Sequence, residues 1–248
     1  MVAAAKLLRH VGRKRTGTFL AEGANLVAAA LARGLVTEVY ATEAALDRYH
    51  ELLQSTPVDL VTEKAAKSLS DTVTPIGLVA VCEMPTPNLD DVLAKSPRLV
   101  AVAVETSEPG NAGTLIRLAD ALGADAVVLA GHSVDPYNGK CLRASAGSIF
   151  ALPVLEIADT AALIHALRAA GMRILATTLD GDVSLDDADL STPTAWLFGA
   201  EAHGLAPEIA TLADSRVRIS MAGSAESLNV AAAAAICLYQ SSRAARQD

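Results

Sequence analysis

The chain has 248 residues, of which 52% are hydrophobic and 3% aromatic, and its formal net charge is −8 at pH 7. The length suffices for one large domain or for a small and a larger one, and the composition excludes a disordered chain. The acidic balance argues against indiscriminate binding of nucleic acids, because phosphate contacts need clustered Lys and Arg. The longest apolar run, 230–239, falls well short of the about 20 residues that span a bilayer.

The N-terminus and the cysteines indicate an intracellular protein. Ala3, Ala4 and Ala5 precede Lys6, which reverses the order of charged and apolar residues in a secretory signal. We therefore expect a cytoplasmic location. Three cysteines far apart predict neither a disulfide framework nor a metal knuckle, and we expect them to be buried, inert thiols. They are Cys82, Cys141 and Cys237.

Basic residues are concentrated at the start of the chain, before the first acidic residue, Glu22. This cluster could follow an RNA backbone, or it could be a solvated helix and turn that keeps the chain soluble. The sequence alone does not decide between the two. The cluster consists of Lys6, Arg9, Arg13, Lys14 and Arg15.

The first third of the chain predicts a small α/β domain. Short apolar runs at 18–21, 36–41, 58–61 and 77–82 predict strands, and they alternate with helical stretches such as 24–33. The next segment, 83–98, carries three prolines and interrupts the pattern, so it predicts a linker with at most a short helix. We place the domains at 1–84 and 99–248, joined by a linker at 85–98.

The second domain predicts a parallel sheet covered by helices. Its strand-like runs are nearly all apolar, which is typical of strands buried on both faces. Gly123 and Gly171 follow two helical stretches at the place where a left-handed residue ends a helix. The predicted strands are 99–104, 126–130, 173–177, 195–198 and 217–219. The predicted helices are 112–122, 138–148, 160–170 and 227–243.

The first motif is the loop 105–111, which lies between a strand and a helix. Asn111 is a suitable helix N-cap, and Gly110 and Gly113 allow the backbone to approach a ligand closely. Arg117 interrupts the apolar stripe of that helix. Taken alone, such an arginine is more often a surface partner of Asp120, three residues away.

The second motif, 196–205, is a buried strand that ends in a loop bracketed by Gly199 and Gly204. Loops after the carboxyl ends of strands bind ligands in open α/β sheets. Gly199 could admit an adenine or a ribose against the backbone, and Glu201 could hold the loop or a neighbouring arginine. A plain turn between a strand and a helix is the alternative.

The third motif, 219–230, is a strand end, a loop containing Gly223, and the start of the final helix. Ser227 is the expected N-cap of that helix, and Asn229 would then lie in its first turn. The three motif loops are thus expected at one edge of one sheet.

In this order and spacing the three motifs resemble the SpoU family of the SPOUT methyltransferases. The stretch 143–150 also matches that family, and 18–23 with 69–77 resemble the substrate-binding domain that precedes the catalytic domain in many members. The resemblance implies a small N-terminal α/β domain followed by a parallel-sheet α/β domain. It further implies a C-terminal trefoil knot around the cofactor, and a homodimer.

The resemblance implies transfer of a methyl group from S-adenosylmethionine to a ribose 2′-hydroxyl of structured RNA, without a metal. The implied catalytic residues are Arg117, Asn111, Glu201, Ser227 and Asn229. The implied cofactor-binding residues are Thr177, Gly199, Ile219 and Leu228. The RNA-binding residues that we expect are Arg9, Arg13, Lys14, Arg15 and Arg143.

The chemistry of the guanidinium group limits the role of Arg117. It is permanently protonated in proteins, so we expect a phosphate clamp that stabilises the developing alkoxide rather than a general base. The proton would then pass to an RNA phosphate or to water. His203 is an alternative base, because an unperturbed histidine titrates near neutrality.

Several functions remain open at this stage. An rRNA 2′-O-methyltransferase acting on 23S rRNA is favoured, and a tRNA methyltransferase is the close alternative. A non-catalytic RNA-binding or ribosome-assembly factor could keep the same fold. A nicotinamide dehydrogenase is disfavoured, because no GxGxxG follows the first strand of either domain.

Overall fold

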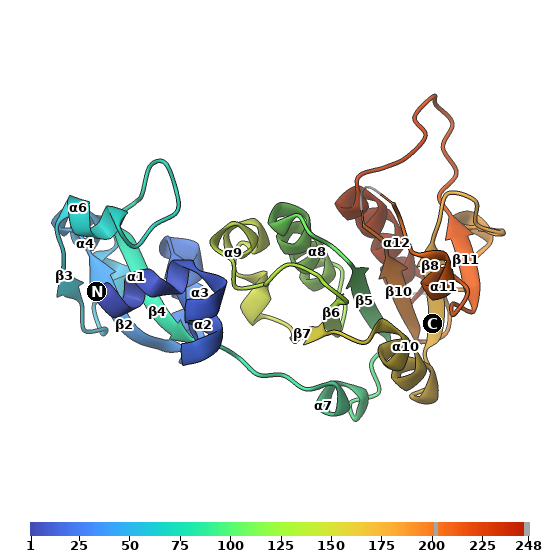
Figure 1. Ribbon diagram of the computed structural model, residues 1–248, viewed down its shortest axis with the longest axis horizontal. Coiled ribbons are helices and arrows are strands. Elements are labelled where there is room, and N and C mark those ends of the chain that lie inside the picture. Colours follow the sequence, from blue (N-terminus) through green and yellow to red (C-terminus); the bar gives the residue numbers. More distant parts are fainter. Residues whose placement is uncertain (201–202, 246–248) are drawn as a thin grey trace.

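The computed structural model describes residues 1–200 and 203–245 and contains two β-sheets, which lie side by side along the long axis of the molecule (Figure 1). The first sheet has the strand order β1-β4-β2-β3, in which β4 runs antiparallel to β1 and β2. Its strands confirm the small N-terminal α/β unit. They are β1 (Thr18–Glu22), β2 (Val36–Ala41), β3 (Asp59–Leu60) and β4 (Leu78–Glu83).

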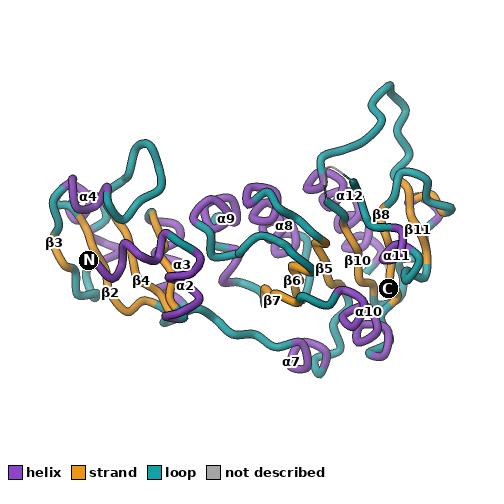
Figure 2. The backbone as a smooth tube through the Cα atoms, viewed as in Figure 1, coloured by secondary structure: helices purple, strands orange, loops and turns teal. Residues whose placement is uncertain are grey.

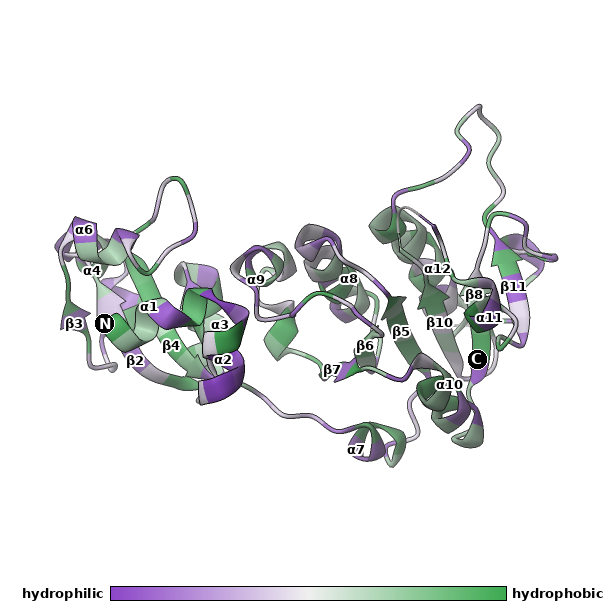
Figure 3. Cartoon of the chain, in the orientation of Figure 1, coloured by the Kyte–Doolittle hydropathy of each residue, from purple (hydrophilic) through white to green (hydrophobic). Residues whose placement is uncertain are grey.

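Short helices precede β1 and connect the strands that follow. Helix α2, which is largely hydrophilic in Figure 3, carries Arg13, Lys14 and Arg15 of the basic cluster. The helix predicted at 24–33 is α3. The helices are α1 (Val2–Ala5), η1 (Lys6–Leu8), α2 (His10–Thr16), α3 (Ala24–Ala32), α4 (Glu43–Arg48), α5 (His50–Leu53) and α6 (Glu63–Lys67).

The segment between the two sheets carries the single short helix α7 (Leu89–Leu93), as expected. Its N-cap is Asn88, whose side-chain oxygen accepts a hydrogen bond from the Asp91 amide at 2.8 Å. Figure 2 shows the rest of the connection as loop. The domain limits 1–84, 85–98 and 99–248 remain our proposal.

The second sheet has seven strands in the order β7-β6-β5-β10-β8-β11-β9, and every neighbouring pair is parallel. This confirms the predicted parallel sheet. The short strands β7 and β9 were not predicted, and β11 ends one residue earlier than expected. The strands are β5 (Leu99–Val104), β6 (Ala126–Ala130), β7 (Val154–Ile157), β8 (Arg173–Thr177), β9 (Val183–Ser184), β10 (Thr194–Phe198) and β11 (Ser215–Arg218).

Helices cover both faces of this sheet, because its side chains alternate between two hydrophobic clusters. Ala101 of β5 packs in one cluster with residues of α8, α9 and α12, whereas Val102 packs in the other with residues of α7, α10 and α11. The helices are α8 (Pro109–Ala121), α9 (Gly139–Ser145), η2 (Ser148–Phe150), α10 (Thr160–Ala169), η3 (Leu185–Asp187), α11 (Pro207–Ala210) and α12 (Val230–Ala244).

Three helix boundaries differ from the prediction. The N-cap of α8 is Glu108 rather than Asn111, and that of α12 is Asn229 rather than Ser227. The helix predicted at 138–148 is divided into α9 and η2, because Ala146 and Gly147 both adopt positive φ angles, which end an α-helix. Gly123 and Gly171 have the left-handed conformations expected of them.

The two units share one hydrophobic core. Phe19 of β1 contacts two aromatic rings of the second unit, with ring centroids 4.8 Å from Tyr137 and 5.8 Å from Phe150. Beside them, Arg13 of α2 forms a buried ion pair with Asp135 at 2.6 Å, and its guanidinium also donates to the Leu7 carbonyl at 2.8 Å. The N-terminal unit is therefore packed firmly against the second one.

The three cysteines are free and buried, as predicted. Burial disfavours the charged thiolate and raises the pKa of each thiol to about 12, so all three are protonated at neutral pH. Within the described residues, no helix has the length and hydropathy needed to cross a bilayer.

Replacing Asp135 tests the buried ion pair between Arg13 and Asp135. We expect Asp135→Asn to lower the free energy of unfolding by about 3–5 kcal/mol, because it leaves the Arg13 guanidinium buried without a counter-charge. Urea denaturation measures this. The control is Asp182→Asn, which removes an exposed partner of Arg216 and should cost less than about 1 kcal/mol. Equal losses in both variants would contradict a special role for the buried pair.

Candidate active site

The residues predicted for the site converge because their strands are parallel neighbours. β5, β10, β8 and β11 lie next to one another, so their carboxyl ends meet at one edge of the sheet. The first motif follows β5, the second follows β10, and the third follows β11. Thr177 ends β8, where its hydroxyl donates to the Leu197 carbonyl of β10 at 3.0 Å. This edge is where open α/β sheets bind ligands.

The first motif loop is braced against the loop after β6. Glu105 has a positive φ of 55°, and its carboxylate accepts the His132 amide at 3.2 Å. The amide of Thr106 donates to the Ser133 hydroxyl at 3.0 Å, and the carbonyl of Thr106 accepts the Val134 amide at 2.8 Å. A non-glycine residue with positive φ persists only where its surroundings hold it, and these contacts do so.

Glu108 is the N-cap of α8 and links this helix to α9. Its carboxylate accepts the Gly110 amide at 3.2 Å and pairs with the Lys140 ammonium at 2.5 Å. The hydrogen bond from Lys140 and then that from Gly110 hold the pKa of Glu108 below its usual value. Both side chains are exposed, so this contact orients the start of α8 more than it stabilises the fold.

The first and third motifs meet through two asparagines. The Asn229 side-chain amide donates to the Asn111 side-chain carbonyl at 3.2 Å, although the residues are 118 positions apart. Asn229 is held in place because its own carbonyl oxygen caps α12, accepting the Ala231 amide at 2.9 Å. The structure therefore brings together two of the residues predicted for catalysis.

Arg117 lies on the exposed side of α8, whereas its neighbours Leu115 and Ile116 are buried. The surface pair with Asp120 is not formed. Within the described part of the chain, no ion pair or hydrogen bond engages the Arg117 guanidinium. The charge is accessible to an anionic ligand such as a phosphate group.

The second motif closes on itself after β10. The Gly204 amide donates to the Ala200 carbonyl at 2.8 Å, and a Cβ at position 199 would lie 2.2 Å from the carbonyl carbon of Gly204. The glycine at 199 is thus required by the fold of its own loop. His203 is exposed. Glu201 lies outside the described residues.

The third motif loop projects from the sheet edge between β11 and α12 (Figure 1). Ile219 packs partly against the core at the start of the loop, and the Ser220 hydroxyl lies 3.1 Å from that of Ser184. Ser227 and Leu228 are exposed on the loop. Asn229, at the end of the loop, reaches Asn111 of the first motif.

Two threonine hydroxyls at the same edge were missed by sequence reasoning. Those of Thr106, after β5, and Thr178, after β8, are buried and have no hydrogen-bond partner among the described residues. A buried hydroxyl without a partner is costly, so both positions suit the polar groups of a bound ligand. A single threonine at a strand end carries no signal that sequence alone could detect.

The residues predicted to bind RNA divide into two groups. Arg9, Lys14 and Arg15 are exposed. Arg13 was expected to be available to RNA, but its side chain is only 4% exposed and is paired with Asp135. Arg143 is partly exposed and engages Asp71 and Glu22 of the N-terminal unit.

Comparison with known proteins agrees with this geometry. Residues 98–239 match the SpoU rRNA Methylase family, and residues 3–80 match the MRM3-like substrate binding domain. The chain is 37% identical to the 23S rRNA (uridine(2479)-2'-O)-methyltransferase of Streptomyces viridochromogenes, over 93% of this chain and 84% of that protein. It is 35% identical to the 23S rRNA (guanosine(2553)-2'-O)-methyltransferase of Bacillus subtilis, over 94% of this chain and 92% of that protein.

Solved structures show the same similarity. The SpoU methyltransferase AviRb from Streptomyces viridochromogenes in complex with the cofactor AdoMet has a TM-score of 0.87 and 34% identity, covering 97% of this chain and 95% of that one. The AdoMet-bound rRNA methyltransferase from Sinorhizobium meliloti has a TM-score of 0.86 and 32% identity, with coverage of 98% and 93%.

Adding a methyl group at position 199 tests the closed second motif. We expect Gly199→Ala to lower the free energy of unfolding by about 1–3 kcal/mol, because the new Cβ collides with the Gly204 backbone. The control is Gly223→Ala, where a Cβ would have no neighbour within 4 Å. Chemical denaturation of both variants measures the difference. A stable Gly199→Ala protein would show that the loop is not closed in this way.

Proposed function

Because the chain belongs to the SpoU rRNA methylase family, we propose that it transfers a methyl group from S-adenosylmethionine to a ribose 2′-hydroxyl of 23S rRNA. The observation that carries the proposal is the contact between Asn111 and Asn229. This hydrogen bond joins two of the three motifs at the carboxyl edge of the sheet. Asn111 lies on α8, the helix that also carries the accessible Arg117. Relatives named for 23S rRNA support that substrate over tRNA.

The cofactor pocket is proposed at the carboxyl ends of β8, β10 and β11. Thr177, Gly199 and Ile219 end or follow these strands, and Leu228 completes the pocket from the third motif loop. The unpartnered hydroxyls of Thr106 and Thr178 fit a ligand with polar groups. When bound, the cofactor supplies a methyl group that is already electrophilic, so the protein's task is to position the ribose and stabilise its alkoxide.

Arg117 carries the electrostatic part of the proposal. Its permanent charge stabilises the developing alkoxide and holds the adjacent RNA phosphate, while the proton leaves to a phosphate or to water. Asn111 and Asn229 keep the start of α8 beside the start of α12. We assign Ser227 to ordering the third motif loop and Glu201 to supporting the second.

RNA is proposed to bind along α2. Lys14 and Arg15 of α2, and Arg9 directly before it, are exposed and suit phosphate contacts. We omit Arg13 and Arg143 from this set, because carboxylates already engage both guanidinium groups.

Three further properties are proposed from family membership. The C-terminal segment forms a trefoil knot around the cofactor, the protein acts as a homodimer, and it works in the cytoplasm. Ile236 and Tyr239 support the dimer, because they lie on one face of α12 with 38% and 54% of their surface exposed. A second copy would cover them, since aromatic and aliphatic side chains are enriched at interface cores.

Radiolabelled methyl transfer tests the activity. With S-adenosylmethionine as donor, we expect label in unmodified 23S rRNA but not in tRNA. Arg117→Ala should reduce the rate at least about a hundredfold and leave cofactor affinity unchanged, because the charge acts on the reacting ribose. Label in tRNA alone would reverse the choice of substrate. Cofactor binding without transfer to either RNA would favour a ribosome-assembly factor.

The salt dependence of RNA binding tests the role of α2. The double variant Lys14→Ala and Arg15→Ala should reduce the slope of log K against log salt by roughly 0.7–0.9 for each lost phosphate contact. The control removes Lys64 and Lys67, which are exposed on α6 of the same unit. An unchanged slope in the first variant, or an equal reduction in the control, would place the RNA elsewhere.

A further inference from the structure

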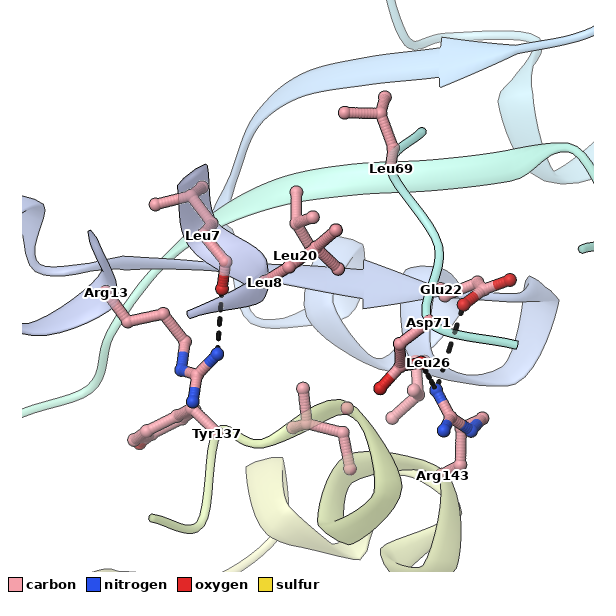
Figure 4. A pocket seen from close by; sticks show the side chains of 12 residues that line it. Leu7, Leu8, Arg13, Leu20, Glu22, Leu26, Leu69, Asp71, Tyr137 and Arg143 are labelled. Atoms are coloured by element: carbon pink, nitrogen blue, oxygen red, sulfur yellow. Dashed lines mark hydrogen bonds and ion pairs between the residues drawn. The ribbon is translucent and has the colours of Figure 1, made fainter. Parts of the chain in front are cut away.

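Arg143 of α9 is held by two carboxylates of the N-terminal unit. Its guanidinium lies 2.5 Å from the Asp71 carboxylate, in the loop before β4, and 3.8 Å from that of Glu22, at the end of β1 (Figure 4). All three side chains line a small cavity between the two units. The contact therefore joins two elements of one unit to a single helix of the other.

The acidic side of this contact is itself fixed in place. The Glu22 carboxylate accepts hydrogen bonds from the Ser70 hydroxyl at 2.7 Å and from the Thr72 hydroxyl at 3.1 Å. The Asp71 loop also passes very close to the start of α9, because a Cβ at Gly139 would lie 2.7 Å from an Asp71 carboxylate oxygen. Both carboxylates that bind Arg143 are therefore held in position by other contacts.

A second ion pair between the two units lies near the contact of Arg143 with Glu22 and Asp71. The buried pair between Arg13 and Asp135 connects α2 to the loop that leads into α9. Residues 135–143 are therefore held by the N-terminal unit at both ends. The same helix α2 exposes Lys14 and Arg15, so these ion pairs fix the position of the proposed RNA anchor.

The other side of α9 contacts the proposed active site. Lys140 pairs with Glu108, which begins α8, and a Cβ at Gly113 would lie 2.3 Å from the Cys141 carbonyl oxygen. Helices α8 and α9 are accordingly packed without space between their backbones. A continuous path of contacts leads from the N-terminal unit through α9 to the helix of Asn111 and Arg117.

We propose that Arg143 is a positioning residue for methyl transfer: by clamping Glu22 and Asp71 it sets one fixed separation between the RNA anchor on α2 and Arg117 on α8. This rests on the proposed methyltransferase function and adds a determinant of which ribose reaches the site. An rRNA held on α2 can present only those riboses that lie at that separation. Without the clamp, the shared core and the pair of Arg13 with Asp135 still hold the units together, but α9 is no longer fixed against the loop of Asp71.

Charge reversal and charge exchange test the clamp. Arg143→Glu, which faces Glu22 and Asp71 with a like charge, should raise the KM for 23S rRNA by about tenfold, because the two RNA-binding parts lose their fixed geometry. The kcat and the dissociation constant of S-adenosylmethionine should stay within about twofold. Adding Asp71→Arg restores an ion pair of opposite polarity and should bring the KM back. Arg143→Lys should keep most of the effect of the arginine.

The controls separate the clamp from other roles of Arg143. If Arg143 instead contacts an RNA phosphate, the double variant of Arg143→Glu and Asp71→Arg will keep the high KM of Arg143→Glu, and the proposal is overturned. Arg168→Glu breaks an ion pair of similar exposure within the second unit and should leave the KM unchanged. Melting curves of all variants identify any that fail to fold.

Hydrogen exchange provides a test that does not depend on activity. In the protein alone, Arg143→Glu should speed amide exchange in α9 and in the loop that carries Asp71, and adding Asp71→Arg should slow it again. Unchanged exchange in Arg143→Glu would contradict the clamp. A wild-type protein that methylates no RNA would contradict the proposed function, whereas the exchange result would still decide whether the clamp exists.

Discussion

The parallel alignment of β5, β10, β8 and β11 is the constraint on which the site depends. Parallel strands direct their carboxyl ends to one edge, so loops that are more than 100 residues apart in the chain become neighbours there. The hydrogen bond between Asn111 and Asn229, across 118 positions, is a direct consequence. Each loop alone resembles an ordinary turn, and the sheet makes them one site.

Close backbone packing gives this edge its rigidity. Gly199 allows the second motif to close on Gly204, and Gly113 allows α8 to approach α9. Neither position tolerates even a methyl group without movement of a neighbouring backbone. These glycines therefore serve the packing of the protein itself, in addition to any approach of a ligand.

Charge is used in two ways in this chain. Two of the arginines that we expected to bind RNA are paired with carboxylates instead. The buried Arg13 pairs with Asp135, and Arg143 is held by Glu22 and Asp71. The exposed Arg9, Lys14 and Arg15 remain for phosphate contacts. A net charge of −8 is compatible with RNA binding because Lys14 and Arg15 are exposed together on α2, with Arg9 directly before it.

The sequence by itself determined the parallel sheet, the short helix in the linker, the buried thiols and the glycine helix ends at Gly123 and Gly171, because hydrophobic pattern and glycine conformation are local properties. Family resemblance, not physical pattern, indicated the methyltransferase motifs. Only the tertiary structure decided that Glu108 and Asn229 begin α8 and α12, and that Arg13 is buried. Burial of Arg13 depends on Asp135, which lies 122 positions away in the sequence. Several polar residues before each helix could cap it, and the packing of the helix decides which of them does.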